Sequence, residues 1–451
     1  VNMGVMVPCH EILARAKVEG ADIIGLSGLI TPSLEEMQYV ASEMQKDDHF
    51  RLRKIPLLIG GATCSRVHTA VKIAPHYEGP VVYVPDASRS VGVAQGLLSD
   101  QAAQFIDDLN TDYAKVREQH ANKKQTPLLP LAKARANAPH IDWAAYQPTS
   151  PKFIGKRVFK NFDLAELEAF IDWGPFFQTW DLAGPFPAIL KDEVVGAEAQ
   201  RVFSDGKRML KRLIEGRWLQ AHAVVGLYPA NSVGDDIVLW TDETRTQRAL
   251  TWHGLRQQTE KPLRDGVHNP NRCLSDFVAP LNQGADHVGL FAVTAGVGVD
   301  AKEKYFMDDH DDYSAIMLKA LADRFAEAFA ECLHERVRKD LWGYAAQESA
   351  SVEELVAEKY QGIRPAPGYP ACPDHSVKKQ MFDLLQCEDI GMGLTESLAM
   401  TPAASVSGFY LSHPDSQYFN VGKVGEDQVH DLAKRQNLKV TDIQRLLAPN
   451  L

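Results

Sequence analysis

The sequence predicts two folds in succession: a parallel, doubly wound, Rossmann-like α/β domain, then a larger α+β domain with a mainly antiparallel sheet. In the first hundred residues, continuous apolar runs alternate with helical patterns, which is typical of strands buried on both faces of a parallel sheet. Beyond residue 150, strand patterns cluster and helical patterns gather separately, as in α+β domains. The length of 451 residues fits two or three domains.

The first part shows a regular alternation of elements. Ser33 is expected to cap its helix, with Glu36 at the capping-box position, and Asp86 is expected to cap a later helix. Strands are predicted over 3–7, 22–29, 55–59 and 79–84, and helices over 11–20, 33–45, 65–74 and 86–98.

Ligands of such sheets bind at the carboxyl ends of the strands. Here those ends are rich in small and hydroxyl residues. Each one is explained equally well by a tight βα turn, but together they favour a ligand. They are Ser27, Gly28, Leu29, Thr31, Ser33, Gly60, Gly61 and Ala87.

A charged helix is predicted over about 101–124, and the proline-rich run 123–152 is interpreted as an interdomain linker. The second part is expected to contain helices over 186–214 and 311–341 and strands over 224–227, 237–240, 249–255 and 288–294. The segment 231–236 reads as a hairpin loop too long for a two-residue turn.

Composition limits the class of function. The net charge of −11 argues against a general nucleic-acid or anionic-membrane surface. Six scattered cysteines without a C-x-x-C motif are typical of reduced thiols, so we expect a cytoplasmic protein. No apolar run approaches the length of a membrane span.

The stretch from Arg364 to Pro370 has three prolines in seven residues, so it is predicted to be a stiff loop. Arg364 presents a planar fork of donors that suits a carboxylate or phosphate. Gly368 allows a close backbone approach, and Tyr369 offers a ring with a polar tip. The loop therefore predicts a site for a small anionic group, although a solvated surface turn fits the same composition.

Acidic residues that could complete such a site occur elsewhere. Asp323, Glu327, Glu331 and His334 form one polar stripe of the long helix, which is either a solvated face or a stripe facing a cationic ligand. Glu331-x-x-His334 is half of a di-iron motif, but a second half is lacking, and no metal site is expected.

Three other short motifs contain residues of types that bind ligands or metals. Asp172 lies among aromatic residues and is either a helix cap or a partner for an ammonium group. The pair Tyr418-Phe419 follows a polar turn and is typical of either a core or a site. Cys372 and His375 lack partners for a metal or a catalytic role.

Several long motifs resemble the C-terminal half of cobalamin-dependent methionine synthases, and the resemblance covers nearly the whole chain. SGLITPSLEEM (27–37), LLIGGAT (57–63) and DASRSVG (86–92) resemble the cobalamin domain of that family. Five further segments resemble the activation domain of that family: IDWGPFF (171–177), DEVVGAEAQR (192–201), HERVRK (334–339), RPAPGYPACPDH (364–375) and SGFYLSHPDSQYF (407–419). The domains expected are 1–104 for cobalamin, 105–125 as a helical or linker segment, and 126–451 for activation.

The resemblance implies roles at matching positions. Arg364 would bind the carboxylate of S-adenosylmethionine and Asp172 its amino group, while Glu327 and Glu358 would lie near its sulfonium. The other implied contacts to this ligand are Ala366, Tyr369, Tyr418 and Phe419. Cobalamin would be contacted by Ser27, Thr31, Ser33, Gly60, Gly61 and Ala87, with Ser33 in the relay to the cobalt's lower ligand.

The sequence departs from the family in one respect. The cobalt-ligating histidine belongs to a D-x-H-x-x-G motif that does not occur here, so no catalytic residue is assigned, and this histidine is expected upstream of Val1. The chain is interpreted as part of a longer protein, lacking the first strand of the cobalamin domain. Cobalamin binding is expected to be impaired, and zinc is expected only in the parent enzyme.

The resemblance also implies a reaction and partners. The parent methylates homocysteine, and its activation domain supports reductive methylation of cob(II)alamin. The expected electron donor is reduced flavodoxin or a flavoprotein reductase, and the homocysteine and folate domains would precede this chain. We expect a monomer that does not make methionine alone. The alternatives are a corrinoid carrier or sensor, a methyltransferase with another acceptor, and a flavoprotein scaffold.

Overall fold

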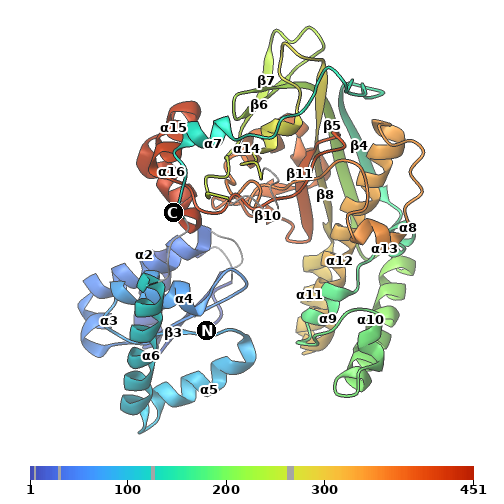
Figure 1. Cartoon of the computed structure of the whole chain (residues 1–451). Coiled ribbons are helices and arrows are strands. Elements are labelled where there is room, and N and C mark those ends of the chain that lie inside the picture. The colour runs from blue at the N-terminus through green and yellow to red at the C-terminus, as the bar shows by residue number, and fades with distance from the viewer. Residues whose placement is uncertain (5–6, 29–31, 123–126, 262–268) are drawn as a thin grey trace. The chain divides into compact units, whose positions relative to one another are not determined.

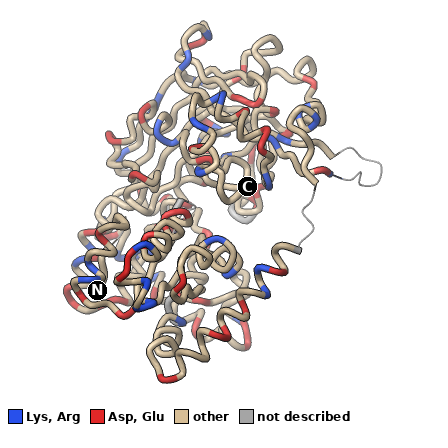
Figure 2. Tube along the Cα trace, turned by 90° about the vertical axis from the view of Figure 1, so that its left-hand side faces the viewer, with Lys and Arg blue, Asp and Glu red and all other residues tan. Residues whose placement is uncertain are grey.

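The computed structural model describes residues 1–4, 7–28, 32–122, 127–261 and 269–451. The chain folds into two compact units, residues 1–127 with 444–451, and residues 128–443 (Figure 1). Basic and acidic residues are interspersed along the chain in both units (Figure 2). No helix in the described ranges is both long and apolar enough to cross a lipid bilayer.

The first unit is built on three parallel strands in the order β1-β2-β3. These are β1 (Ile24–Ser27), β2 (Leu57–Gly60) and β3 (Val81–Tyr83). The helices between and after them are α1 (Cys9–Glu19), α2 (Pro32–Lys46), α3 (Asp48–Arg53), α4 (Arg66–His68), η1 (Thr69–Ile73), η2 (Ala74–His76), α5 (Ala87–Leu98) and α6 (Ala102–Asn122). Alternating strands and helices therefore give a parallel sheet, as the apolar runs predict.

Two predictions for this unit are wrong. Met3, Gly4 and Val7 belong to no strand, and residues 5–6 lie outside the described ranges. Ser33 is the second residue of α2 rather than its N-cap. Asp86, in contrast, caps α5 as predicted, because its side chain accepts a hydrogen bond from the backbone N–H of Arg89 at 3.1 Å.

The second unit is organised around a six-stranded sheet with antiparallel pairing. The strand order is β11-β8-β5-β6-β7, and β4 pairs with β5. The strands are β4 (Gly155–Phe162), β5 (Gln220–Val233), β6 (Asp236–Trp240), β7 (Arg248–His253), β8 (Asp286–Val297) and β11 (Ser405–Tyr410). A separate ribbon pairs β9 (Gly393–Leu394) with β10 (Met400–Thr401). The mainly antiparallel sheet predicted for this part is confirmed.

Both faces of this sheet are buried, because alternate side chains of a strand point to opposite faces. Ala223 and Val225 of β5 join one core with helices α10 and α12, whereas Val224 and Tyr228 join a second core with α14. The helical segments of this unit are α7 (Leu131–Ala136), α8 (Leu164–Glu168), α9 (Gly174–Gln178), η3 (Ala188–Lys191), α10 (Gly196–Glu215), η4 (Leu274–Phe277), α11 (Val299–Asp308), α12 (Asp312–Arg336), η5 (Val337–Leu341), α13 (Val352–Val356), α14 (Val377–Leu385), η6 (Cys387–Ile390) and α15 (Glu426–Gln436). The chain ends with α16 (Val440–Leu446) and η7 (Ala448–Asn450).

The hairpin between β5 and β6 corrects a prediction. Val233 pairs with Asp236, so the connection is the two-residue turn Gly234-Asp235, with Gly234 at φ 62°. The long loop was predicted because Asn231 and Ser232 are polar. Their side chains instead donate hydrogen bonds to carbonyl groups of residues 278, 279 and 284, which are distant in sequence.

The proline-rich run 123–152 is not a linker throughout. From residue 128 it packs on the second unit: Leu129 donates its backbone N–H to the Gln258 carbonyl at 2.7 Å. Arg135 of α7 pairs with Asp235 at 2.7 Å and with Asp431 at 2.8 Å. The predicted helix 186–214 is also shorter, because α10 begins only at Gly196.

Helix α12 is the central helix of the first of these cores, and Phe329 on it is completely buried. We predict that Phe329→Ala lowers the free energy of unfolding by about 3–5 kcal/mol, because a large cavity would form. All seven tryptophans belong to residues 128–443, so tryptophan fluorescence in a urea titration reports this unit. Ile316→Ala on the same helix is the control, since Ile316 is 44% exposed. Equal losses for the two variants would contradict this packing.

Candidate functional site

The segment around Arg364 extends the large sheet beyond its edge strand β11. Ile363 and Leu411 exchange backbone hydrogen bonds of 2.9 and 3.0 Å, and Phe409 donates its N–H to the Pro365 carbonyl at 2.9 Å. Arg364 lies between these two anchor points. Its backbone is therefore held to the edge of the sheet, although the prolines prevent a regular strand.

A compact turn follows and closes the loop on itself. Gly368 donates to the Cys372 carbonyl at 2.8 Å, and the Cys372 thiol donates to the Ala366 carbonyl at 2.8 Å. Gly368 has φ 98°, and a Cβ at this position would come within 2.1 Å of the His375 ring. Only glycine fits this geometry, both for its dihedral angle and for the imidazole packed against it.

The Arg364 side chain is 20% exposed and reaches the carboxyl-terminal half of α12. Its Nη2 pairs with Glu331 Oε2 at 2.7 Å. Its Nη1 lies 3.3 Å from His334 Nδ1 and donates to the Tyr360 hydroxyl at 3.1 Å. The backbone N–H of Arg364 donates to the Tyr418 hydroxyl at 2.9 Å. The guanidinium is thus fixed by three side chains from two segments.

Electrostatics in this cluster follow from burial and from these pairs. Burial acts to lower the pKa of Arg364, but Glu331, together with Tyr360 and Tyr418, opposes burial and raises that pKa above its usual value. Burial, with the nearby Arg338 and Arg364, holds the pKa of His334 well below its usual range, so this imidazole is neutral. Burial raises the pKa of Glu327 and of Glu358, and Arg364 opposes both shifts.

Five residues predicted from sequence therefore share one neighbourhood. The charge of Arg364 acts to lower the pKa of both Glu327 and Glu358. The charges of Glu327 and Arg364 both act on the pKa of Tyr369. Tyr418 contacts the loop directly. Tyr369 and Tyr418 are 60% and 37% exposed, so this neighbourhood opens to solvent.

Two further predicted residues lie close to the loop in other roles. The Ala366 carbonyl accepts the bonds that close the turn, including that from the Tyr369 N–H at 3.1 Å. Phe419 is half-buried and packs against the core that contains α14. Ala366 therefore supports the loop and Phe419 supports that core, and contact of both with the ligand stays a prediction.

The structure does not bring Asp172 into the Arg364 cluster. Asp172 is half-buried, and its Oδ1 accepts a hydrogen bond from the Gly174 N–H at 2.9 Å. Among the interactions resolved for the described residues, none joins it to Arg364. The helix that follows it, α9, does pack on α12, the helix that carries Glu331. Asp172 thus makes a local turn just before α9, whose N-cap position is Trp173, and its contact with an ammonium stays a prediction.

Two alternatives were open for the polar stripe of the long helix, and the solvated face does not apply to Glu331 and His334. Glu331 is 6% exposed and His334 is fully buried. The sequence left the choice open because their partner, Arg364, is distant in sequence and a stripe alone does not show what covers it. Tyr360 was missed altogether, since a tyrosine four residues before an arginine carries no distinctive signal. No group of three or more metal-binding side chains occurs in the described part of the chain.

Three of the residues predicted for cobalamin, Ser27, Gly60 and Gly61, lie at the ends of β1 and β2, where Ser27 is in register with Gly60. Packing explains the glycines there: Gly61 has φ 103°, and a Cβ on it would lie 2.3 Å from the Gly28 carbonyl oxygen. Ser33 is half-buried in α2, and Ala87 is the first residue of α5. Thr31 lies outside the described residues. Cobalamin contact at these positions therefore stays a prediction, and the glycines alone do not mark a cofactor site.

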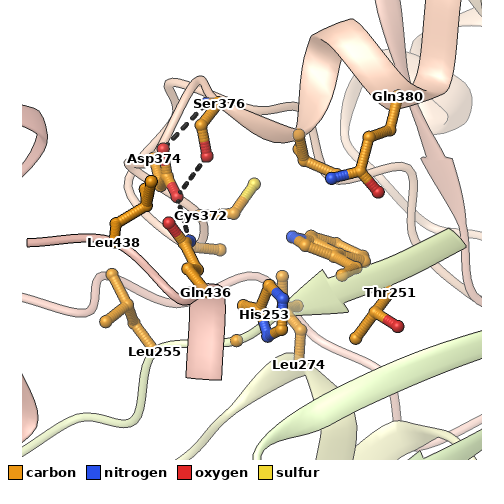
Figure 3. A pocket seen from close by; sticks show the side chains of 14 residues that line it. Thr251, His253, Leu255, Leu274, Cys372, Asp374, Ser376, Gln380, Gln436 and Leu438 are labelled. Carbon is orange, nitrogen blue, oxygen red and sulfur yellow. Dashed lines mark hydrogen bonds between the residues drawn. The ribbon is translucent and has the colours of Figure 1, made fainter. Parts of the chain in front are cut away.

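A cavity of about 200 Å³ lies in the second unit, between β7, the segment around Cys372 and the end of α15. Asp374 accepts hydrogen bonds from Ser376 and Gln436 on one wall, and His253 lines another (Figure 3). None of the residues predicted to bind S-adenosylmethionine lines it. The Cys372 and Asp374 side chains are thus wall residues with structural hydrogen bonds.

Fold and cluster together define an α+β domain that presents a fixed arginine beside the edge of an antiparallel sheet. Residues 163–437 match the family model described as "Vitamin B12 dependent methionine synthase, activation domain". The chain therefore belongs to this family, which places it among the methyltransferases.

A solved structure is similar to the chain over most of its length. It is entitled "Crystal Structure of the MetH Reactivation Domain bound to AdoHcy" and shares 53% sequence identity with a TM-score of 0.69. The alignment covers 72% of this chain and 99% of that one. The resemblance to the C-terminal part of methionine synthase is therefore confirmed.

The packing of His375 against Gly368 predicts a pH dependence of stability. Burial, assisted by Lys378 and opposed by Asp374, lowers the pKa of His375 to about 4. Unfolding restores the usual value near 6.5, so the unfolded chain binds more protons between these limits. Stability is therefore complete above about pH 6.5 and is lost as the pH falls towards 4, by about 3 kcal/mol over the whole window.

We predict that His375→Gln reduces the difference in unfolding free energy between pH 7 and pH 5, measured by urea titration with tryptophan fluorescence. The other buried histidines stay in both proteins, so the change isolates His375. The exposed His430, replaced by glutamine, serves as the control. An unchanged pH difference in the His375 variant would rule out this coupling.

Proposed function

We propose that this chain binds S-adenosylmethionine at the Arg364 cluster and supports the reductive methylation that reactivates cobalamin in a methionine synthase. The observation that carries the proposal is the set of contacts that fixes Arg364 beside acidic residues, in a domain 53% identical to one whose structure is entitled as bound to AdoHcy. S-adenosylhomocysteine is S-adenosylmethionine without the transferred methyl group, so one site serves both.

The charges of the cluster suit this ligand. S-adenosylmethionine carries a carboxylate, an ammonium and a sulfonium, so its site needs one cation and several acids. Arg364 supplies the cation, and the carboxyls of Glu327 and Glu358 stand within its electrostatic reach. The raised pKa values of these two carboxyls reflect burial, and a ligand cation nearby would favour their ionised form.

The chain's own part in the reaction is to bind and orient the methyl donor. Arg364 would hold the amino-acid end through its guanidinium, and the exposed ring of Tyr369 would limit the movement of the remainder. Cobalamin, when bound, supplies the cobalt that receives the methyl group together with one electron. We propose reduced flavodoxin or a flavoprotein reductase as the electron donor.

The proposed reaction as a whole requires further domains besides this chain. The homocysteine and folate domains are proposed to belong to the same enzyme, and methionine is not expected from this chain alone. The proposal differs from a corrinoid carrier or sensor in one testable respect. A carrier would bind cobalamin without any dependence on Arg364.

We predict that Arg364→Ala weakens the binding of S-adenosylhomocysteine by about 10- to 150-fold in isothermal titration calorimetry. This range corresponds to about 1.5–3 kcal/mol for the loss of a charge-assisted pair. Arg208→Ala is the matched control, because Arg208 is an exposed arginine that pairs only with Asp205 in the described interactions. Equal affinities of wild type and Arg364→Ala for S-adenosylhomocysteine would contradict the proposed function.

A further inference from the structure

The hydrogen bonds of Arg364 leave part of its guanidinium unused. Arginine has five N–H donors in one plane. The two on Nη1 are directed to His334 and Tyr360, and one on Nη2 is taken by Glu331. Nε–H and the second N–H of Nη2 have no acceptor among the described residues. These two nitrogens form one edge of the plane, and their spacing matches the two oxygens of a carboxylate.

Glu331 is unusual among the acids of the second unit because it is buried and only half satisfied. It is 6% exposed, and its Oε1 is buried without a hydrogen-bond partner in the described structure, while Oε2 pairs with Arg364. A buried carboxylate oxygen without a partner is costly. The hydrogen bonds of Glu331 itself therefore do not explain why it is buried. Its ion pair with Arg364, which fixes the guanidinium, does explain it.

His334 completes the restraint and is itself fixed. For Nδ1 to face Arg364 Nη1 at 3.3 Å it must be the acceptor nitrogen, so the proton lies on Nε2, which is 3.5 Å from the Tyr344 hydroxyl. The ring also stacks on Tyr410 at 5.0 Å between centroids, with an interplanar angle of 17°. A protonated His334 would present a donor and a positive charge to the guanidinium, so this packing requires the neutral ring.

We propose that Glu331, His334 and Tyr360 are positioning residues that hold the Arg364 plane so that its Nε–Nη2 edge receives the carboxylate of the methyl donor. This inference rests on the proposed function and deepens it, because it assigns a role to three residues that do not themselves touch the ligand. Without Glu331 the long arginine side chain samples several rotamers. Ligand binding must then order this side chain, and the entropy lost in doing so weakens the affinity.

The inference makes a prediction about ligand chemistry that a purely structural role does not. Glu331 acts on binding only through the carboxylate of the ligand. S-adenosylhomocysteine has this carboxylate, whereas 5′-methylthioadenosine has the same adenosine and thioether but neither carboxylate nor ammonium. A general distortion of the site would weaken both ligands, and a misplaced Arg364 would weaken only the first.

We expect Glu331→Gln to raise the Kd of S-adenosylhomocysteine about tenfold and to leave that of 5′-methylthioadenosine within about twofold of wild type, in calorimetry at one pH and salt concentration. The double variant Glu331→Gln/Arg364→Ala should bind S-adenosylhomocysteine no more weakly than Arg364→Ala alone, since the two residues act through one contact. Equal weakening of both ligands, or additive effects in the double variant, would overturn the positioning role.

Asp276→Asn is the matched control for the loss of a buried pair. Asp276 pairs with the buried Arg256 at 2.7 Å, and neither residue has a contact with Arg364, Glu331, His334 or Tyr360 among the described interactions, so its loss should lower the thermal midpoint but leave the ratio of the two affinities unchanged. The failures of the two proposals are distinguishable. If Arg364→Ala binds like wild type, the proposed function fails and this inference with it. If Arg364→Ala loses binding while Glu331→Gln keeps it, only the positioning role fails.

Discussion

The ion pair between Arg364 and Glu331 joins the two parts of the molecule on which the candidate site depends. Arg364 belongs to a loop bonded along β11, and Glu331 belongs to α12, which packs against β8 and β11. An almost buried guanidinium without a counter-charge would be strongly unfavourable. Glu331 removes that penalty, and in doing so it ties the loop to α12. The loop, the helix and the sheet edge thus form one rigid support.

Buried pairs of this kind contribute little net stability compared with apolar side chains of similar size. Their value lies in specifying geometry, and here the geometry is that of a partly unused arginine. Around it, Glu327 and Glu358 supply negative charge without a hydrogen bond to the guanidinium among the interactions resolved for described residues. The arrangement separates a cationic end from an acidic surround, which is the polarity of an amino acid that also carries a sulfonium.

The sequence predicts those features of this molecule that depend on local rules. Apolar runs identify the parallel strands of the first unit, Asp86 identifies the start of α5, and the proline pattern identifies the loop at Arg364. The cation and several acids of the site follow from residue type and from the family resemblance. Each of these signals lies within a few residues of the feature that it predicts.

The predictions that fail depend on partners distant in sequence. Asn231 and Ser232 are predicted to lie in a loop because they are polar. They lie in β5 instead, because carbonyl groups of residues 278, 279 and 284 accept hydrogen bonds from their side chains. For Glu331 and His334 the sequence left a solvated face and a ligand-facing stripe as alternatives, and only the folded structure, in which Arg364 contacts both residues, excludes the first. The run after residue 128 is predicted to be a linker because it is rich in proline. It packs on the second unit instead, where Arg135 forms ion pairs with Asp235 and Asp431. No local pattern contains this information, because it arises only when the chain folds.

The most direct test of the account is a crystal structure of this chain with S-adenosylhomocysteine. The account predicts the ligand carboxylate on Nε and Nη2 of Arg364, with Glu331 still paired to Nη2 and His334 still beside Nη1. A ligand seated in the cavity between His253 and Asp374, or a carboxylate that displaces Glu331 from the guanidinium, would contradict it.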